Sequence, residues 1–163
     1  MIFLFAAIGE LLDQRSGILN VGLEGLMLVG ALGAFIVAGE TGNPWLGFGA
    51  GIAAGALFGL IHGFLSITLQ ADQVVSGMGI WIFALGLTTY IGNPLSGPLA
   101  EGAKMDGILG GLTPMFFIGL AIVFMVWFVL FKTRIGLEIR SVGEDPYVAA
   151  ASGLSVRRYG TYV

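Results

Sequence analysis

Four polar side chains that could line a path for a solute or an ion lie near the start of a strongly apolar chain: Asp13, Arg15, Asn20 and Glu24. The step from Ser16 to Gly17 is expected to interrupt a helix, and Asn20 and Glu24 are spaced to share one face of the next helix. Ionisable groups inside a membrane segment are costly and usually face a protein interior or a watery cavity. Broken helices are typical of transporter pathways, so this region is a candidate border of such a pathway. A cytoplasmic hairpin turn, with Glu24 paired to Arg15 for structure only, is an equally good interpretation.

A second polar group occupies residues 132–158, the longest polar segment of the chain. It contains five of the seven basic residues, namely Lys132, Arg134, Arg140, Arg157 and Arg158. Because Lys and Arg are enriched in cytoplasmic loops of membrane proteins, we expect this segment on the cytoplasmic side. Asp145 suits an N-cap, Pro146 suits the first helical position, and Gly153 suits the left-handed residue after a helix. We therefore predict a short helix at 146–152 that could bind a soluble partner, with a plain solvated connector as the alternative.

The composition is that of an integral membrane protein. Hydrophobic residues make up 56% of the 163 residues and charged residues 10%, with a mean hydropathy of +0.94. A soluble domain carries roughly 25% charged residues. We expect an all-α fold, a polytopic transmembrane helical bundle with about five spans and a short cytoplasmic helix. The whole chain, 1–163, is expected to form part of a single transmembrane domain.

Apolar runs predict where the spans lie. Long runs occupy residues 18–39, 45–69, 74–92 and 114–131, whereas the run 1–12 is too short to span alone, since a crossing needs about 20 residues. Counting crossings back from the basic segment places two turns, 13–20 and 71–73, on the cytoplasmic side. The same count places the turn 40–44 and the longer loop 93–113 outside.

Two features inside the spans have structural and functional interpretations. Gly51, Gly55, Gly59 and Gly63 recur every four residues, which predicts a smooth stripe where another helix can approach closely. Ordinary helix packing explains such a stripe better than a pathway does. His62 lies beside it and could be a proton relay or a ligand, although no partner is evident and a structural role is favoured.

Several classes of function are disfavoured. The chain has no cysteine, which excludes disulfides and thiolate metal sites, and no Gly-Lys-Ser/Thr phosphate loop. We expect no cofactor, no metal site and no catalytic residue. An intramembrane enzyme would need a nucleophile and a base within reach, and the candidates Ser76 and His62 lie on separate predicted spans without a wider motif.

Three segments together resemble one family. They are RSGILNVGLEGLMLVGA at 15–31, ADQVVSG at 71–77 and GLEIRSVGEDPYVAAASGLSVRR at 136–158. They are similar to bacterial ABC-importer permeases of the simple-sugar and nucleoside uptake type, which are related to ribose and branched-chain amino-acid permeases. The cytoplasmic loop of that family typically contains Arg-x-x-Gly-Glu-Asn-Pro, then Ala-Ala, then Gly. The matching residues here are Arg140, Gly143, Glu144, Asp145, Pro146, Ala149, Ala150 and Gly153, with Asp145 in place of the commoner Asn.

The resemblance implies a multi-pass subunit of an ATP-driven importer in the bacterial plasma (inner) membrane, translocating nucleosides or simple sugars. It implies four partners: cytosolic ABC ATPase subunits, a second permease subunit, an extracytoplasmic substrate-binding protein and the lipid bilayer, but no nucleic acid. ATP hydrolysis would belong to the ATPase, so this subunit would not be an enzyme. The matching loop residues would form the ATPase-coupling helix, and Arg15, Asn20 and Glu24 would border the pathway. The chain would correspond to roughly the first half of such a permease.

Two other transporters remain as alternatives. An ion-coupled secondary transporter would need buried acids as ion sites, for which Glu24 and Asp72 are the candidates. A branched-chain amino-acid ABC permease would share the coupling arrangement and differ in its solute.

Overall fold

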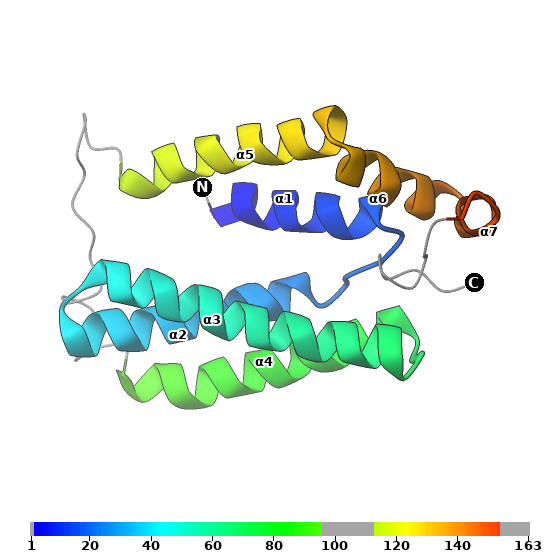
Figure 1. Ribbon diagram of the computed structural model, residues 1–163. Helices are drawn as coiled ribbons and strands as arrows, with labels where there is room; N and C mark the ends of the chain where they lie inside the picture. Colours follow the sequence, from blue (N-terminus) through cyan, green and yellow to red (C-terminus); the bar gives the residue numbers. More distant parts are fainter. Residues whose placement is uncertain (1, 96–112, 154–163) are drawn as a thin grey trace. The chain divides into compact units, whose positions relative to one another are not determined.

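The computed structural model describes residues 2–95 and 113–153, and every regular element within them is helical (Figure 1). The elements are α1 (Ile2–Arg15), α2 (Leu23–Thr41), α3 (Pro44–Gly63), the π-helix η1 (Phe64–Thr68), α4 (Gln73–Leu95), α5 (Pro114–Lys132), α6 (Arg134–Glu144) and α7 (Pro146–Ala151). The prediction of an all-α fold is thus confirmed.

Four of the described helical segments are long and apolar enough to cross a membrane: Leu23–Thr41, Pro44–Thr68, Gln73–Leu95 and Pro114–Lys132. The polytopic prediction is confirmed, with four such spans in the described residues where about five were expected. The helix α1 has 14 residues and is not among them. Most of the predicted loop 93–113 and the end of the basic segment, 154–158, lie outside the described residues.

The predicted span 18–39 begins five residues later than expected, at Leu23. Gly17 has a left-handed backbone with φ +81°, and the amides of Gly17 and Ile18 donate to the carbonyls of Gln14 and Asp13 at 3.2 and 3.0 Å. This pair of bonds is the Schellman arrangement that ends a helix. Residues 18–21, which are apolar except for Asn20, therefore belong to a turn after α1, because the chain has already left the helix.

The other two turns between spans form where the sequence predicts them. Gly42, at φ +64°, follows α2, and the Asn43 side chain accepts a 3.0 Å hydrogen bond from the Trp45 amide at the start of α3. Asp72 accepts two bonds of 2.9 Å from the amides of Val74 and Val75 and so caps α4. Each cap satisfies donors that a helix start leaves unpaired.

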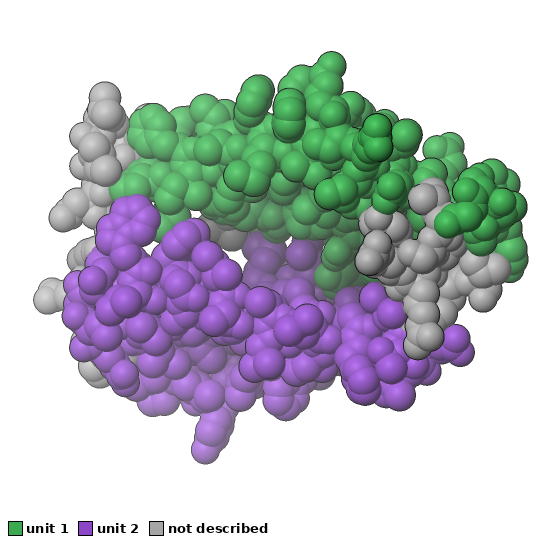
Figure 2. Space-filling view, in the orientation of Figure 1, with its two compact units in different colours: residues 1–20, 107–163 green, residues 21–106 purple. Residues whose placement is uncertain are grey.

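The chain divides into two compact units, coloured separately in Figure 2. Unit 1 comprises residues 1–20 and 107–163 and contains α1, α5, α6 and α7. Unit 2 comprises residues 21–106 and contains α2, α3, η1 and α4. Whether both belong to one functional domain stays a prediction.

Unit 2 is built on close backbone approach between α2 and α3. A Cβ added at Gly47 would lie 2.5 Å from the Ala38 Cβ, and one at Gly51 would lie 2.9 Å from the Gly30 carbonyl oxygen. The predicted stripe is therefore shifted toward the start of α3. A Cβ on Gly55 would lie 3.9 Å from the Leu26 carbonyl oxygen, and one on Gly63 would have no atom of another helix within 4 Å among the described residues.

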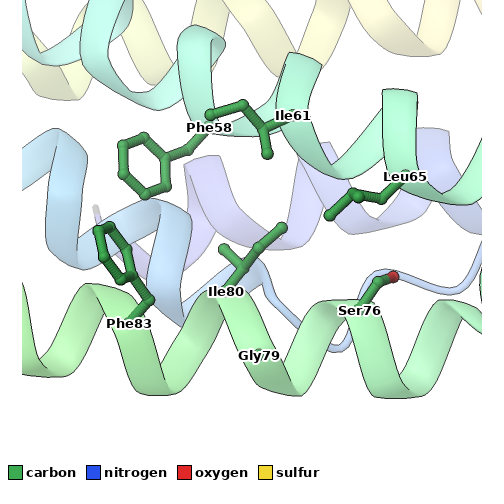
Figure 3. A pocket seen from close by; sticks show the side chains of 7 residues that line it. All are labelled: Phe58, Ile61, Leu65, Ser76, Gly79, Ile80 and Phe83. Carbon is green, nitrogen blue, oxygen red and sulfur yellow. The ribbon is translucent and has the colours of Figure 1, made fainter.

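An apolar groove of about 310 Å³ lies between the α3–η1 segment and α4 within unit 2 (Figure 3). Its lining residues are Phe58, Ile61, Leu65, Ser76, Gly79, Ile80 and Phe83. The rings of Phe58 and Phe83 stack with their centroids 6.1 Å apart. Ser76 supplies the one hydroxyl among these residues.

Candidate functional site

The helix α7 confirms the predicted short helix in the basic segment, one residue shorter than expected. The Asp145 Oδ1 atom accepts hydrogen bonds from the amides of Tyr147 and Val148, at 2.9 and 3.0 Å, and Pro146 occupies the first turn. Gly153 follows the helix with φ +86°. Asp145, Pro146 and Gly153 therefore lie where a capped, independent helix needs them, and the solvated-connector alternative is wrong.

The exposed side chains of α7 differ from those that the loop motif picks out. Tyr147 and Val148 are 68% and 61% exposed, whereas Ala149 is only 3% exposed. Ala150 and Gly153 are also exposed. These two large side chains, exposed on a short helix within the basic segment, could provide a contact surface for another protein. Sequence reasoning overlooked them, although large apolar residues inside a charged loop were a visible indication.

The basic segment contains a second helix, α6, that was not predicted. The Thr133 side chain caps it by accepting a 3.2 Å bond from the Gly136 amide, and Val142 is completely buried. Arg140 lies over the Phe131 ring at 4.9 Å and donates from Nε to the Gly136 carbonyl at 3.3 Å. The Arg140 side chain is thus engaged in contacts within the chain itself, at the corner between α5 and α6. Glu144, at the end of α6, is exposed.

Gly143 lies against the end of α1. A Cβ at this position would overlap the Arg15 carbonyl oxygen and would lie 3.1 Å from the Gly17 amide nitrogen. Both neighbours are backbone atoms, so they cannot turn aside as a side chain can. Within unit 1, the end of α6 and the end of α1 are therefore in direct backbone contact, which the loop motif alone did not indicate.

The polar turn after α1 differs from its prediction. Asn20 is 7% exposed, and its Nδ2 donates a 2.9 Å hydrogen bond to the Asp13 Oδ2, while its buried Oδ1 has no partner among the described residues. Arg15 is exposed, and Glu24 is exposed in the first turn of α2. The prediction that Asn20 and Glu24 share a helical face is wrong, because α2 begins after Asn20. A role of these residues in a pathway stays a prediction.

His62 is the other buried polar residue of note. It is 3% exposed, and neither ring nitrogen has a hydrogen-bond partner in the described part of the chain. One turn later, in η1, the hydroxyl of the buried Ser66 lies 3.3 Å from that of Ser76 on α4. Within residues 2–95 and 113–153, no group of three His, Cys, Asp or Glu side chains could hold a metal ion.

Comparison with known families covers the whole chain. Residues 1–163 match the family described as the permease component of the branched-chain amino acid transport system. The chain belongs to this family of permeases. As a permease component with four candidate spans, it is a multi-pass membrane protein.

Three relatives of this permease resemble it along most of its length. One is TsgC13 of Haloferax volcanii, provisionally named a glucose ABC transporter permease protein, which is 40% identical over 97% of this chain and 53% of its own. The guanosine ABC transporter permease protein NupQ of Bacillus subtilis is 39% identical over 94% of this chain and 56% of its own. The nucleoside ABC transporter permease protein NupC of Lactococcus lactis is 34% identical over 96% of this chain and 56% of its own.

The permease chain therefore spans about half the length of the curated relatives that it matches. No solved structure matches it. Its relatives come from an archaeon as well as from bacteria. The expected resemblance to bacterial permeases therefore applies to archaeal permeases too.

Proposed function

We propose that this chain is part of the translocation subunit of an ATP-driven importer for nucleosides or simple sugars in a prokaryotic plasma membrane. The observation that carries the proposal is α7, a helix capped by Asp145 that presents Tyr147 and Val148. The family and the names of its relatives support a permease role. Of the loop-motif residues, Asp145, Pro146 and Gly153 would form the ends of α7, and Tyr147 and Val148 would supply the contact with the ATPase.

The proposed coupling uses α7 as the contact for a cytosolic ABC ATPase. A nucleotide can shift a conformational equilibrium only if the partner contacts differ between the two states. An exposed apolar pair on a short helix provides such a contact, because it can be buried when the ATPase is bound in one orientation. ATP hydrolysis would thus remain with the partner, and a second permease subunit would complete the pathway.

The placement of α7 on the cytoplasmic side has support beyond the basic residues. Because Gly143 packs on Arg15, the turn after α1 and the end of α6 lie close together in unit 1. Both segments were placed on the cytoplasmic side from the sequence, and this contact requires that they share a side. The polar turn with Asn20 would then face the cytoplasmic end of the pathway.

The solute class rests on the relatives. They are named for guanosine, for nucleosides and for glucose. Each of these solutes is either a neutral sugar or a neutral molecule that contains a sugar. An extracytoplasmic substrate-binding protein would deliver the solute. The family description makes a branched-chain amino acid the second candidate.

The decisive experiment replaces residues 146–153 of the full-length protein by a Gly/Ser linker and measures recovery of the ATPase in a pull-down. We expect recovery to be lost. The matched control replaces Glu40 and Thr41, in the exposed last turn of α2, by Gly and Ser, and should leave recovery intact. Undiminished recovery with the linker would count against coupling through α7.

A second measurement separates the remaining candidates. The assembled complex is heated with a panel of nucleosides, sugars and branched-chain amino acids, since a ligand that binds only the folded state raises the melting temperature. Stabilisation by amino acids alone would favour the second solute class. Uptake by membranes that lack the ATPase would favour an ion-coupled transporter.

A further inference from the structure

The helix α6 is fixed at both ends by backbone contact with other helices of unit 1. At its start, a Cβ on Gly136 would lie 2.5 Å from the Leu130 Cα of α5. Toward its end, a Cβ on Gly143 would lie 2.9 Å from the Arg15 carbonyl carbon of α1. Neither position has room for a side chain. Since α6 lies directly on the backbones of α5 and α1, it cannot be displaced without moving them.

The part of α1 that Gly143 contacts is itself firmly tied to the polar turn. The Ile18 amide donates to the Asp13 carbonyl at 3.0 Å, and the Asn20 side chain donates to the Asp13 carboxylate at 2.9 Å. Gly17, whose amide nitrogen faces Gly143, lies between these residues. A displacement applied at Gly143 therefore reaches Asn20 through two short hydrogen bonds to one residue of α1.

At the other end, α7 follows α6 with a single residue between them. Asp145 donates its amide to the Ser141 carbonyl of α6 at 3.2 Å, and its carbonyl accepts from the Ala149 amide of α7 at 3.0 Å. Its side chain caps α7 at the same time. One residue is thus bonded into both helices, so α7 cannot swing freely on a flexible connection.

We propose that α7, α6 and the end of α1 move as one body, and that Gly143 is the positioning residue that transmits movement of α7 to the turn at Asp13–Asn20. This inference rests on the proposed function, since it is the ATPase that would displace α7. It assigns Gly143 a contact inside the permease instead of a contact with the ATPase. The movement would reach Asn20 through α1 as well as reaching the spans through α5.

The first test measures a distance in the full-length complex. The present chain has no cysteine, so spin labels on Gln14→Cys and Ser152→Cys, in a protein free of other cysteines, report the separation of α1 and α7. Both positions are exposed. We expect the same separation without nucleotide and with ATP. In the Gly143→Ala background we expect the separation to depend on ATP, because the contact is forced open.

A second test measures function. Gly143→Ala should leave ATPase recovery unchanged while lowering uptake roughly ten-fold, within the range of coupling changes produced by contacts along such routes. Gly9→Ala is the matched control, because the added Cβ on this α1 glycine has no atom of another described element within 4 Å. It should change neither quantity.

The outcomes separate the two proposals. If the unsubstituted protein fails to recover the ATPase, the proposed function is wrong. If recovery is normal but ATP changes the Gln14–Ser152 separation in the unsubstituted protein, the one-body inference is overturned. A separation that stays constant in Gly143→Ala, or normal uptake by that variant, also overturns it. Should Gly143→Ala fail to fold, the separation in the unsubstituted protein still decides the matter.

Discussion

Adding a methyl group to the glycines of α3 should destabilise the protein in an order set by their distance from α2. At Gly47 the new Cβ would lie 2.5 Å from the Ala38 Cβ and 2.6 Å from the Ala34 carbonyl oxygen. At Gly51 the shortest distance is 2.9 Å, to the Gly30 carbonyl oxygen, and at Gly55 it is 3.9 Å. The predicted order of destabilisation is therefore Gly47→Ala, then Gly51→Ala, then Gly55→Ala.

The size of the effect follows from the overlap. Carbon atoms in contact prefer a separation of about 3.5–4.0 Å, so the Gly47→Ala methyl is about 1 Å too close to Ala38. The neighbours are backbone and Cβ atoms, and the two helices must separate to make room. Overpacking of this kind costs about 1–3 kcal/mol, and we expect Gly47→Ala near the upper end of that range. For Gly51→Ala, where the overlap is smaller, about 1 kcal/mol is expected.

The control is Gly49→Ala, on the same helix but with no atom of another helix in the described part of the chain within 4 Å of the added Cβ. It changes backbone freedom as the other substitutions do, so the difference from it isolates the contact with α2. The assay is the unfolding temperature of the purified full-length protein in one detergent, followed by size-exclusion fluorescence. If Gly47→Ala unfolds at the same temperature as Gly49→Ala, the close α2–α3 approach is wrong.

Two further substitutions test the polar elements. Asp145→Ala should destabilise α7 by about 1 kcal/mol, because two amide donors lose their acceptor. Faster hydrogen exchange at the amides of Tyr147 and Val148 would measure this loss. Asp145→Asn should keep these two amides protected, because Asn also caps helices. Asn20→Asp should place two carboxylates in contact and destabilise the protein at neutral pH. The loss should diminish as the pH falls toward about 4 and one carboxyl is protonated. At neutral pH it should exceed the loss from Asn20→Ala, which removes the hydrogen bond to Asp13 without adding a second carboxylate; a pH series of unfolding temperatures compares the two.

The spans were predictable because length and hydropathy alone determine them. The turns at Asn43–Pro44 and Asp72 were predictable as well, since these residue types cap helices wherever they stand. The start of α2 was not predictable, because three of the four residues 18–21 are apolar and precede the apolar helix without a break in hydropathy. Composition identifies the segments that are apolar enough to lie in a membrane. The end of α1, however, is set by the left-handed backbone of Gly17.

The glycine pattern shows a second limit of the sequence. Four-residue spacing correctly indicated that α3 approaches another helix, yet it placed the contact over Gly51–Gly63. The close approach lies instead at Gly47 and Gly51, where α2 supplies Gly30, Ala34 and Ala38. Small residues on one helix permit contact, but only the matching small residues on the partner determine where it occurs. The sequence of one helix is therefore not enough to predict which of its residues contact the neighbouring helix.

The helix α6 was overlooked for a related reason. Basic residues marked 132–158 as a loop, and a loop was expected to contain one short helix at most. The residues that make α6 a packed element are Gly136, Val142 and Gly143, two of which have no side chain to show a hydrophobic pattern. Close backbone packing leaves little trace in hydropathy, so it became visible only from the neighbouring backbones of α5 and α1.

The loop motif therefore combines residues with different tasks. Asp145 and Gly153 define the ends of α7, Arg140 covers Phe131, and Gly143 fits the end of α1. The side chains best placed to touch another protein, Tyr147 and Val148, stand at positions that the motif leaves open. A partner that recognises the shape of α7 needs the first set to build the helix and the second set to bind it. Substitutions in the two sets should thus be separable, with stability lost in one and binding in the other.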